Sequence, residues 1–141
     1  MNQVIAIDPG LTSGVAILKN YKGLYKIETN TVALDRDDMR IFMDKHKDCR
    51  FWVIEKPIAY SPMAAEAEMC MGYWCCAIDF ICHEETEYYV QYPKEREKYM
   101  KIAKSFGVSN HMQDALAHLL KHLDKTEHEI YEIVIKKEVK E

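Results

Sequence analysis

An acidic side chain at the end of an apolar strand is the feature that most constrains this chain. Val4–Ile7 is a continuous apolar run, and Asp8 stands between this run and a Pro-Gly turn. Glu55 holds the same position after a second apolar run, Phe51–Ile54. A carboxylate beside a buried strand is costly unless its charge is used. The two positions therefore favour a functional role for both acids.

The surrounding pattern predicts an α/β fold. Turn residues after the first strand predict two antiparallel partner strands, at Gly14–Leu18 and Tyr25–Val32, before strands and helices begin to alternate. We therefore expect a mixed five-stranded sheet, with three antiparallel strands followed by parallel crossover strands, flanked by helices. The later strands are expected at Phe51–Ile54 and Tyr88–Val90, and the helices are expected to begin at Asp35, Ser61, Pro93 and Ser109. The tail from residue 127 onward is compatible with a helix or a strand.

The helix that begins at Ser109 adds two polar side chains to the two strand-end acids. His111 and Asp114 are three residues apart, so they share one helix face, opposite a leucine-rich stripe. Because Asp8 and Glu55 end neighbouring central strands, we expect them at one level of the sheet, within reach of the start of this helix. Carboxylate oxygens with few nitrogen ligands suit Mg²⁺ or Mn²⁺ better than zinc. Two such ions roughly 4 Å apart can activate water and stabilise the leaving oxygen of a phosphodiester.

Each of these residues also has a structural interpretation. Asp8 could form the turn, Glu55 could pair with the adjacent Lys56, and an acid early in a helix is favoured by the helix dipole. His118, one turn beyond Asp114, could support the site or be an ordinary satisfied or exposed histidine. The joint occurrence of all the site positions in this element order favours the metal site.

Along residues 3–123 the chain resembles the RuvC-type Holliday junction resolvases of the RNase H-like superfamily. The matching motifs are I-A-I-D-P-G-L-T-S-G-V-A-I at 5–17, V-I-E at 53–55 and H-M-Q-D-A-L-A-H-L-L at 111–120. An intervening helix with a central glycine also fits, as does an aromatic strand followed by a proline and a basic helix. The resemblance implies a nuclease domain over 1–123, a C-terminal extension without a predicted role over 124–141, and a compact member of the kind that bacteriophages encode.

The resemblance also implies a metal-dependent endonuclease that resolves Holliday junctions. Asp8 would bridge two Mg²⁺ ions, which Mn²⁺ can replace, while Glu55 and Asp114 would each hold one ion. His111 would be a further ligand or would orient the attacking water. Such enzymes are homodimers that nick opposing strands of a four-way junction symmetrically, leaving a 5′-phosphate and a 3′-hydroxyl.

Three alternatives to a junction resolvase follow from the same residues. The first is a related RNase H-like nuclease that acts on flap DNA or RNA, and the second is a non-catalytic module that binds branched DNA. The third is an actin-like ATPase, whose first phosphate loop is similar in sequence. An actin-like ATPase needs a second, duplicated domain, for which 141 residues leave no room.

Basic and aromatic residues supply the candidate DNA contacts. Lysines form one stripe of the helix after Pro93, and a tyrosine lies in the loop after Glu55, where it could stack on an unpaired base. The candidates are Lys94, Arg96, Lys98, Lys101, Lys104, Lys56 and Tyr60. Because the helix also carries Glu95 and Glu97, a solvated charged face is the alternative.

Composition restricts the function only loosely. The net charge of −4 is weak evidence against nucleic acid, because a carboxylate cluster that binds cations contributes to it. The five cysteines are expected to be reduced thiols, with a zinc site as the alternative. The first residues do not resemble a secretory signal, and the longest apolar stretch, 69–82, is too short and too polar to cross a membrane. We therefore expect a cytoplasmic protein, in the host cell if a phage encodes it. Its helix is apolar on more than one face, which fits a dimer interface or burial beneath the sheet.

Overall fold

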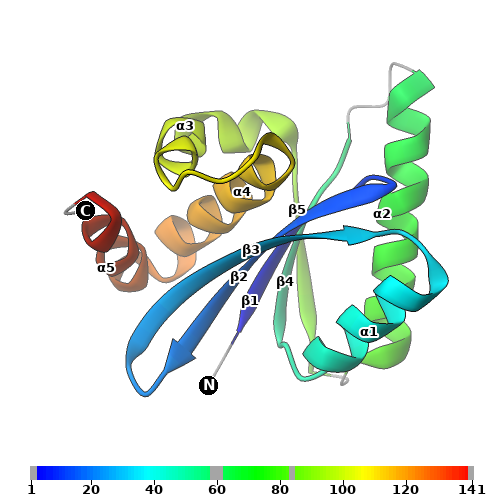
Figure 1. Ribbon diagram of the computed structural model, residues 1–141, viewed down its shortest axis with the longest axis horizontal. Coiled ribbons are helices and arrows are strands. Elements are labelled where there is room, and N and C mark those ends of the chain that lie inside the picture. The colour runs from blue at the N-terminus through cyan, green and yellow to red at the C-terminus, as the bar shows by residue number, and fades with distance from the viewer. Residues whose placement is uncertain (1–2, 58–61, 83–84, 140–141) are drawn as a thin grey trace.

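The computed structural model describes residues 3–57, 62–82 and 85–139, which form one mixed sheet with helices on both faces (Figure 1). The strands are β1 (Val4–Asp8), β2 (Thr12–Tyr21), β3 (Leu24–Ala33), β4 (Phe51–Glu55) and β5 (Glu87–Gln91). They lie in the order β3-β2-β1-β4-β5, antiparallel from β3 to β1 and parallel from β1 to β5. The predicted five-stranded α/β architecture, with its central β1, is confirmed.

Five helices cover the sheet in two groups. The helices are α1 (Arg36–His46), α2 (Pro62–Ile81), α3 (Pro93–Ser105), α4 (Asn110–Thr126) and α5 (His128–Val139). Helices α1 and α2 lie on one side of the sheet, and α3, α4 and α5 lie on the other (Figure 1). Helix α4 makes the direct contact with the central strands, and α3 packs on α4.

The central strands are buried on both faces, which explains why they are continuous apolar runs. Alternate side chains of a strand point to opposite faces, so β1 contributes to two cores. Ile5 and Ile7 pack with Trp74 on the α1–α2 side, and Val4 and Ala6 pack in the core formed with α4 on the other. The leucines that the sequence predicts as the buried stripe of α4 are fully buried there.

The β2–β3 hairpin is longer than the sequence predicts. Its strands pair without interruption from Thr12↔Ala33 to Tyr21↔Leu24. The connecting residues Lys22 and Gly23 have φ angles of 53° and 89°, as a tight turn with two left-handed residues requires. The sequence pattern missed the outer part of β2 because the polar residues Thr12, Ser13, Lys19 and Asn20 flank its apolar run.

Helix ends and cysteines follow the sequence closely. Asp35 caps α1, because its carboxylate accepts hydrogen bonds from the backbone N–H groups of Asp37 and Asp38 at 3.0 and 2.9 Å. All five cysteines are free, as expected for reduced thiols. Helix α2 ends at Ile81, so Cys82 lies just beyond it.

The C-terminal tail, whose sequence fitted a helix or a strand, forms helix α5. Tyr131 and Val134 are buried in the core that α4 shares with the sheet. The ring of Tyr131 meets Tyr99 of α3 edge-on, with centroids 6.2 Å apart. The hydroxyl of Tyr99 in turn donates a hydrogen bond to Asp124, near the end of α4. Residues of the expected extension thus complete the core around α4.

Across the ranges that the structure describes, no helix combines the length and apolar character needed to cross a membrane.

Replacing Tyr131 with alanine should lower the free energy of unfolding by about 2–3 kcal/mol, because it leaves a cavity beside Tyr99. Ile133→Ala, on the exposed side of the same helix, should change it by less than about 0.5 kcal/mol. Urea unfolding followed by circular dichroism measures both values. Equal losses in the two variants would contradict the packing of α5 on the core.

Candidate metal centre

Three carboxylates from three elements converge at one end of the sheet. Asp8 ends β1, Glu55 ends β4, and Asp114 projects from the beginning of α4. One oxygen of each lies within 4.8 Å of the others. Because β1 and β4 are parallel and pair Ile7 with Ile54, the two strand-end acids emerge at the same level, as predicted.

The three acids of the cluster differ in their exposure to solvent. Glu55 is buried, with only 6% of its surface exposed, whereas Asp8 and Asp114 are partly accessible. Burial, followed by the negative charges of Glu55 and Asp114, raises the pKa of Asp8 to about 8. The protein alone therefore does not supply enough positive charge at this point to keep all three groups ionised at neutral pH.

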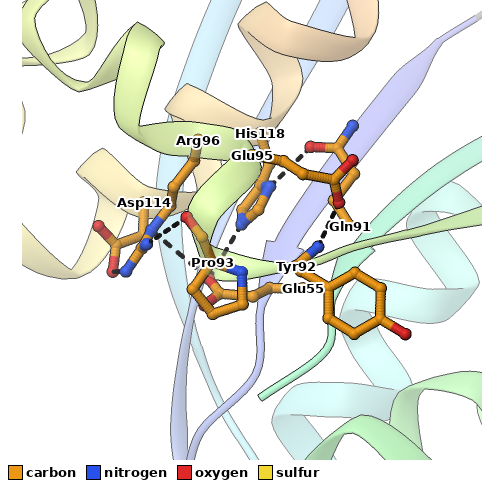
Figure 2. Close-up of polar contacts among 8 residues, drawn as sticks. All are labelled: Glu55, Gln91, Tyr92, Pro93, Glu95, Arg96, Asp114 and His118. Carbon is orange, nitrogen blue, oxygen red and sulfur yellow. Dashed lines mark hydrogen bonds and ion pairs between the residues drawn. The ribbon is translucent and has the colours of Figure 1, made fainter. Parts of the chain in front are cut away.

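His118 holds the buried carboxylate of Glu55 in place (Figure 2). Its Nε2 lies 3.0 Å from Oε2 of Glu55, and its Nδ1 lies 2.7 Å from Oε1 of Gln91 at the end of β5. Burial alone would raise the pKa of Glu55, but the hydrogen bond and charge of His118, together with the charge of Arg96, lower it below its usual value. His118 is thus a buried residue that supports the site, one of the two roles that its sequence position left open.

Arg96 lies inside the acidic cluster instead of on the outer stripe of the basic helix (Figure 2). Its Nη2 donates to Oδ2 of Asp114 at 3.2 Å, and its Nε lies 3.8 Å from Oε2 of Glu55. Its Nη1 donates to the carbonyl oxygen of Pro93 at 2.9 Å. The sequence placed Arg96 among the DNA contacts, and it missed this pairing because the partner is eighteen residues away on another helix. A positive charge in the first turns of a helix opposes the helix dipole, and this was the available signal.

The structure describes the side chains of most of the other predicted DNA contacts. Lys56 is exposed, and its Nζ lies 5.9 Å from the ring centroid of Tyr92, which is also exposed. The remaining candidate lysines are all exposed along α3, and these are Lys94, Lys98, Lys101 and Lys104. Tyr60 lies outside the described residues, and His111 is placed in α4 without a description of its side chain.

The donor set fits a hard divalent cation. Carboxylate oxygens are the ligands that Mg²⁺ and Mn²⁺ prefer, and all three come from rigid strand ends or a buried helix. A cation would also relieve the repulsion that raises the pKa of Asp8. Such a cluster can hold metal ions where a phosphodiester and a water molecule could both reach them, because two of its acids are partly exposed.

Without metal, Asp8→Asn should stabilise the protein at pH 8 but hardly at pH 5. The raised pKa of Asp8 means that the folded protein keeps a proton that the unfolded chain loses above its usual value, so stability falls as the pH rises towards 8. Asparagine removes this loss. With solvent screening taken into account, we expect the free energy of unfolding to rise by on the order of 1–2 kcal/mol at pH 8.

Denaturation in EDTA at the two pH values measures the gain. Asp44→Asn, which removes an exposed carboxylate from α1, is the matched control. An Asp8→Asn variant that is no more stable than the wild type at pH 8 would contradict the electrostatic description of the cluster.

A solved structure shares this fold. Fowlpox virus resolvase, determined in complex with its substrate Holliday junction DNA, matches with a TM-score of 0.53 at 10% sequence identity. The match covers 86% of this chain and 99% of that one. No protein-family model matches the sequence, and a search of curated proteins finds no match either. The predicted α/β fold, a mixed five-stranded sheet flanked by helices, is therefore confirmed, and it is shared with this solved structure.

Proposed function

We propose that this chain is a metal-dependent endonuclease that resolves Holliday junctions and other branched DNA by symmetric nicking. The observation that carries the proposal is the convergence of Asp8, Glu55 and Asp114 within 4.8 Å at the ends of β1 and β4. Two further points support it: the fold is that of a resolvase solved with Holliday junction DNA, and the sequence motifs that carry the RuvC-type resemblance include all three acids.

In this proposal the cluster holds two Mg²⁺ ions, with Mn²⁺ as a substitute. Asp8 would serve both ions, Glu55 and Asp114 would each hold one, and His111 would be a further ligand or would orient the water. The chemistry that the ions supply when bound is activation of water and neutralisation of the leaving oxygen. A water oxygen would attack phosphorus and the bond from phosphorus to the 3′ oxygen would break. The water loses a proton to solvent and the departing 3′ oxygen takes one up, so the products carry a 5′-phosphate and a 3′-hydroxyl.

The chain's own residues prepare the site for this reaction. His118 fixes the carboxylate of Glu55, which keeps one ligand immobile when a cation arrives. Asp8 gives up its proton on cation binding, because a nearby positive charge favours the ionised carboxylate. The partial exposure of Asp8 and Asp114 leaves the side of the cluster away from Glu55 open to a phosphate.

The exposed lysines of α3 are proposed to guide DNA to this opening. The first turns of α3 reach the cluster through Arg96, so the lysines that follow along the helix extend away from the site. A row of positive charge beside an acidic centre can bind the DNA backbone even though the chain as a whole carries −4. Lys56, which follows β4, and Tyr92, which follows β5, are proposed as further DNA contacts near the cluster.

A homodimer is proposed because two opposing strands must be cut. Helix α2 buries one side, with Cys70, Trp74 and Ile78, and exposes apolar residues on the other. The exposed residues on that side are Met69, Tyr73 and Phe80. An exposed apolar surface on a long helix is typical of an isologous interface.

Asp8→Asn should reduce cleavage of a synthetic mobile four-way junction by on the order of 10³-fold or more, because one ligand of the cluster loses its charge. Folding and junction binding, measured by circular dichroism and by gel shift in EDTA, should remain. Asp44→Asn should cleave at the wild-type rate. The products expected from the wild type are paired symmetric nicks near the crossover.

The choice of substrate separates the proposal from its rivals. Linear duplex, flap DNA and an RNA–DNA hybrid are tested beside the junction with Mg²⁺ and with Mn²⁺. Preferred cutting of flap or hybrid would indicate a different RNase H-like nuclease. Junction binding without nicking by the wild type in either metal would leave a non-catalytic binding module.

Phe80→Glu should convert a dimer of twice the 16.5 kDa chain mass into a monomer, because it places a charge in the proposed apolar interface. Leu24→Glu, an equally drastic change at the exposed end of the β2–β3 hairpin, should leave the dimer intact. Size-exclusion chromatography with light scattering measures both. A wild-type monomer at micromolar concentration would contradict the proposed interface.

A further inference from the structure

We infer that Arg96 is a built-in counter-ion of the acidic cluster and that a divalent metal ion displaces its guanidinium group. The inference rests on the proposed metal site and adds a competition within it: the protein carries its own cation where the metal would bind. It concerns binding of metal to the protein alone, so it can be tested without DNA and without cleavage.

The contacts of Arg96 show that the guanidinium and a metal ion would need the same oxygens. Nη2 uses Oδ2 of Asp114, and Nε faces Oε2 of Glu55. Both acids belong to the group whose ligand oxygens lie within 4.8 Å of one another. A cation coordinated there would approach these oxygens to about 2.1 Å, much closer than a guanidinium nitrogen does. Two cations cannot share so small a space without strong repulsion.

The fit of Arg96 in this position is incomplete. Its Nε is buried but, within the described part of the chain, has no hydrogen-bond partner, since 3.8 Å from Glu55 is too long for one. Arginine and carboxylate groups frequently pair through two parallel hydrogen bonds, which Arg96 does not form with either acid. An unpaired buried donor weakens the hold of the cluster on Arg96. The charge of the acids, more than a matched geometry, keeps the side chain in place.

The position of Arg96 along α3 points the same way. The helix begins at Pro93, so Arg96 brings a positive charge close to the end of the helix dipole that repels it. The negative charges of the nearby acids compensate for this unfavourable placement as long as no metal ion neutralises them. Once a metal ion neutralises them, the compensation is lost and the guanidinium can leave. It then becomes available to a DNA phosphate, which is the contact that its sequence position predicts.

The test compares Mg²⁺ binding to the full chain and to two charge variants by isothermal titration calorimetry, without DNA. Arg96→Gln removes the counter-ion and should bind Mg²⁺ about ten-fold more tightly than the wild type. Lys125→Gln removes one exposed charge from the last turn of α4, outside the cluster and outside the proposed DNA contacts, and should bind as the wild type does. Without metal, Arg96→Gln should melt at a lower temperature than Lys125→Gln, and saturating Mg²⁺ should remove most of this difference.

The outcomes separate this inference from the proposed function. Equal or weaker binding by Arg96→Gln, with clear binding by the wild type, overturns the competition and leaves the metal site standing. No binding of Mg²⁺ or Mn²⁺ by any of the three proteins overturns both proposals.

A second measurement needs no variant and covers the case in which Arg96→Gln fails to fold. The Nε–H proton of Arg96 is buried in the metal-free protein, so its exchange with water, followed by NMR, should be slow. Titration with Mg²⁺ should shift this signal and accelerate its exchange as the side chain leaves the cluster. A signal that stays protected at saturating Mg²⁺ would show that Arg96 and the metal bind together, which overturns the inference.

Discussion

The structure depends on one electrostatic conflict, the placing of three carboxylates within 4.8 Å of one another at the end of a buried sheet. Each acid reaches the site because an apolar element carries it there: Asp8 and Glu55 end parallel strands, and Asp114 begins a helix whose other side is fully buried. Apolar burial thus supplies the free energy that holds together groups that repel one another. The raised pKa of Asp8 is the consequence of this burial and repulsion in the metal-free protein.

Two basic side chains relieve the conflict in different ways. His118 is fully buried, bonded on both ring nitrogens, and acts on Glu55 alone. Arg96 is partly exposed, bridges Glu55 and Asp114, and leaves one donor unpaired. The first contact is built into the core and can persist in every state of the site, whereas the second can be exchanged for another cation. The fixed contact of His118 and the replaceable contact of Arg96 together would let the acidic cluster stay folded without metal and still bind a metal ion.

The sequence predicted the parts of the site that depend on local patterns. An apolar run that ends in an acid located Asp8 and Glu55, and the order of the elements predicted that their strands pair side by side. It could not predict the contacts that depend on how helices pack. Arg96 meets Asp114 only because α3 lies against α4, and His118 meets Glu55 across 63 residues of chain. The tail was ambiguous for the same reason, since the burial of Tyr131 exists only once α3 and α4 are in place.

The most direct test of the metal centre is anomalous diffraction from crystals soaked in Mn²⁺. We expect anomalous density between the carboxylates of Asp8, Glu55 and Asp114, with oxygen ligands at about 2.1–2.2 Å and the guanidinium of Arg96 moved out of the cluster. A cluster without anomalous density at saturating Mn²⁺, with Arg96 still bonded to Asp114, would contradict the proposed metal site.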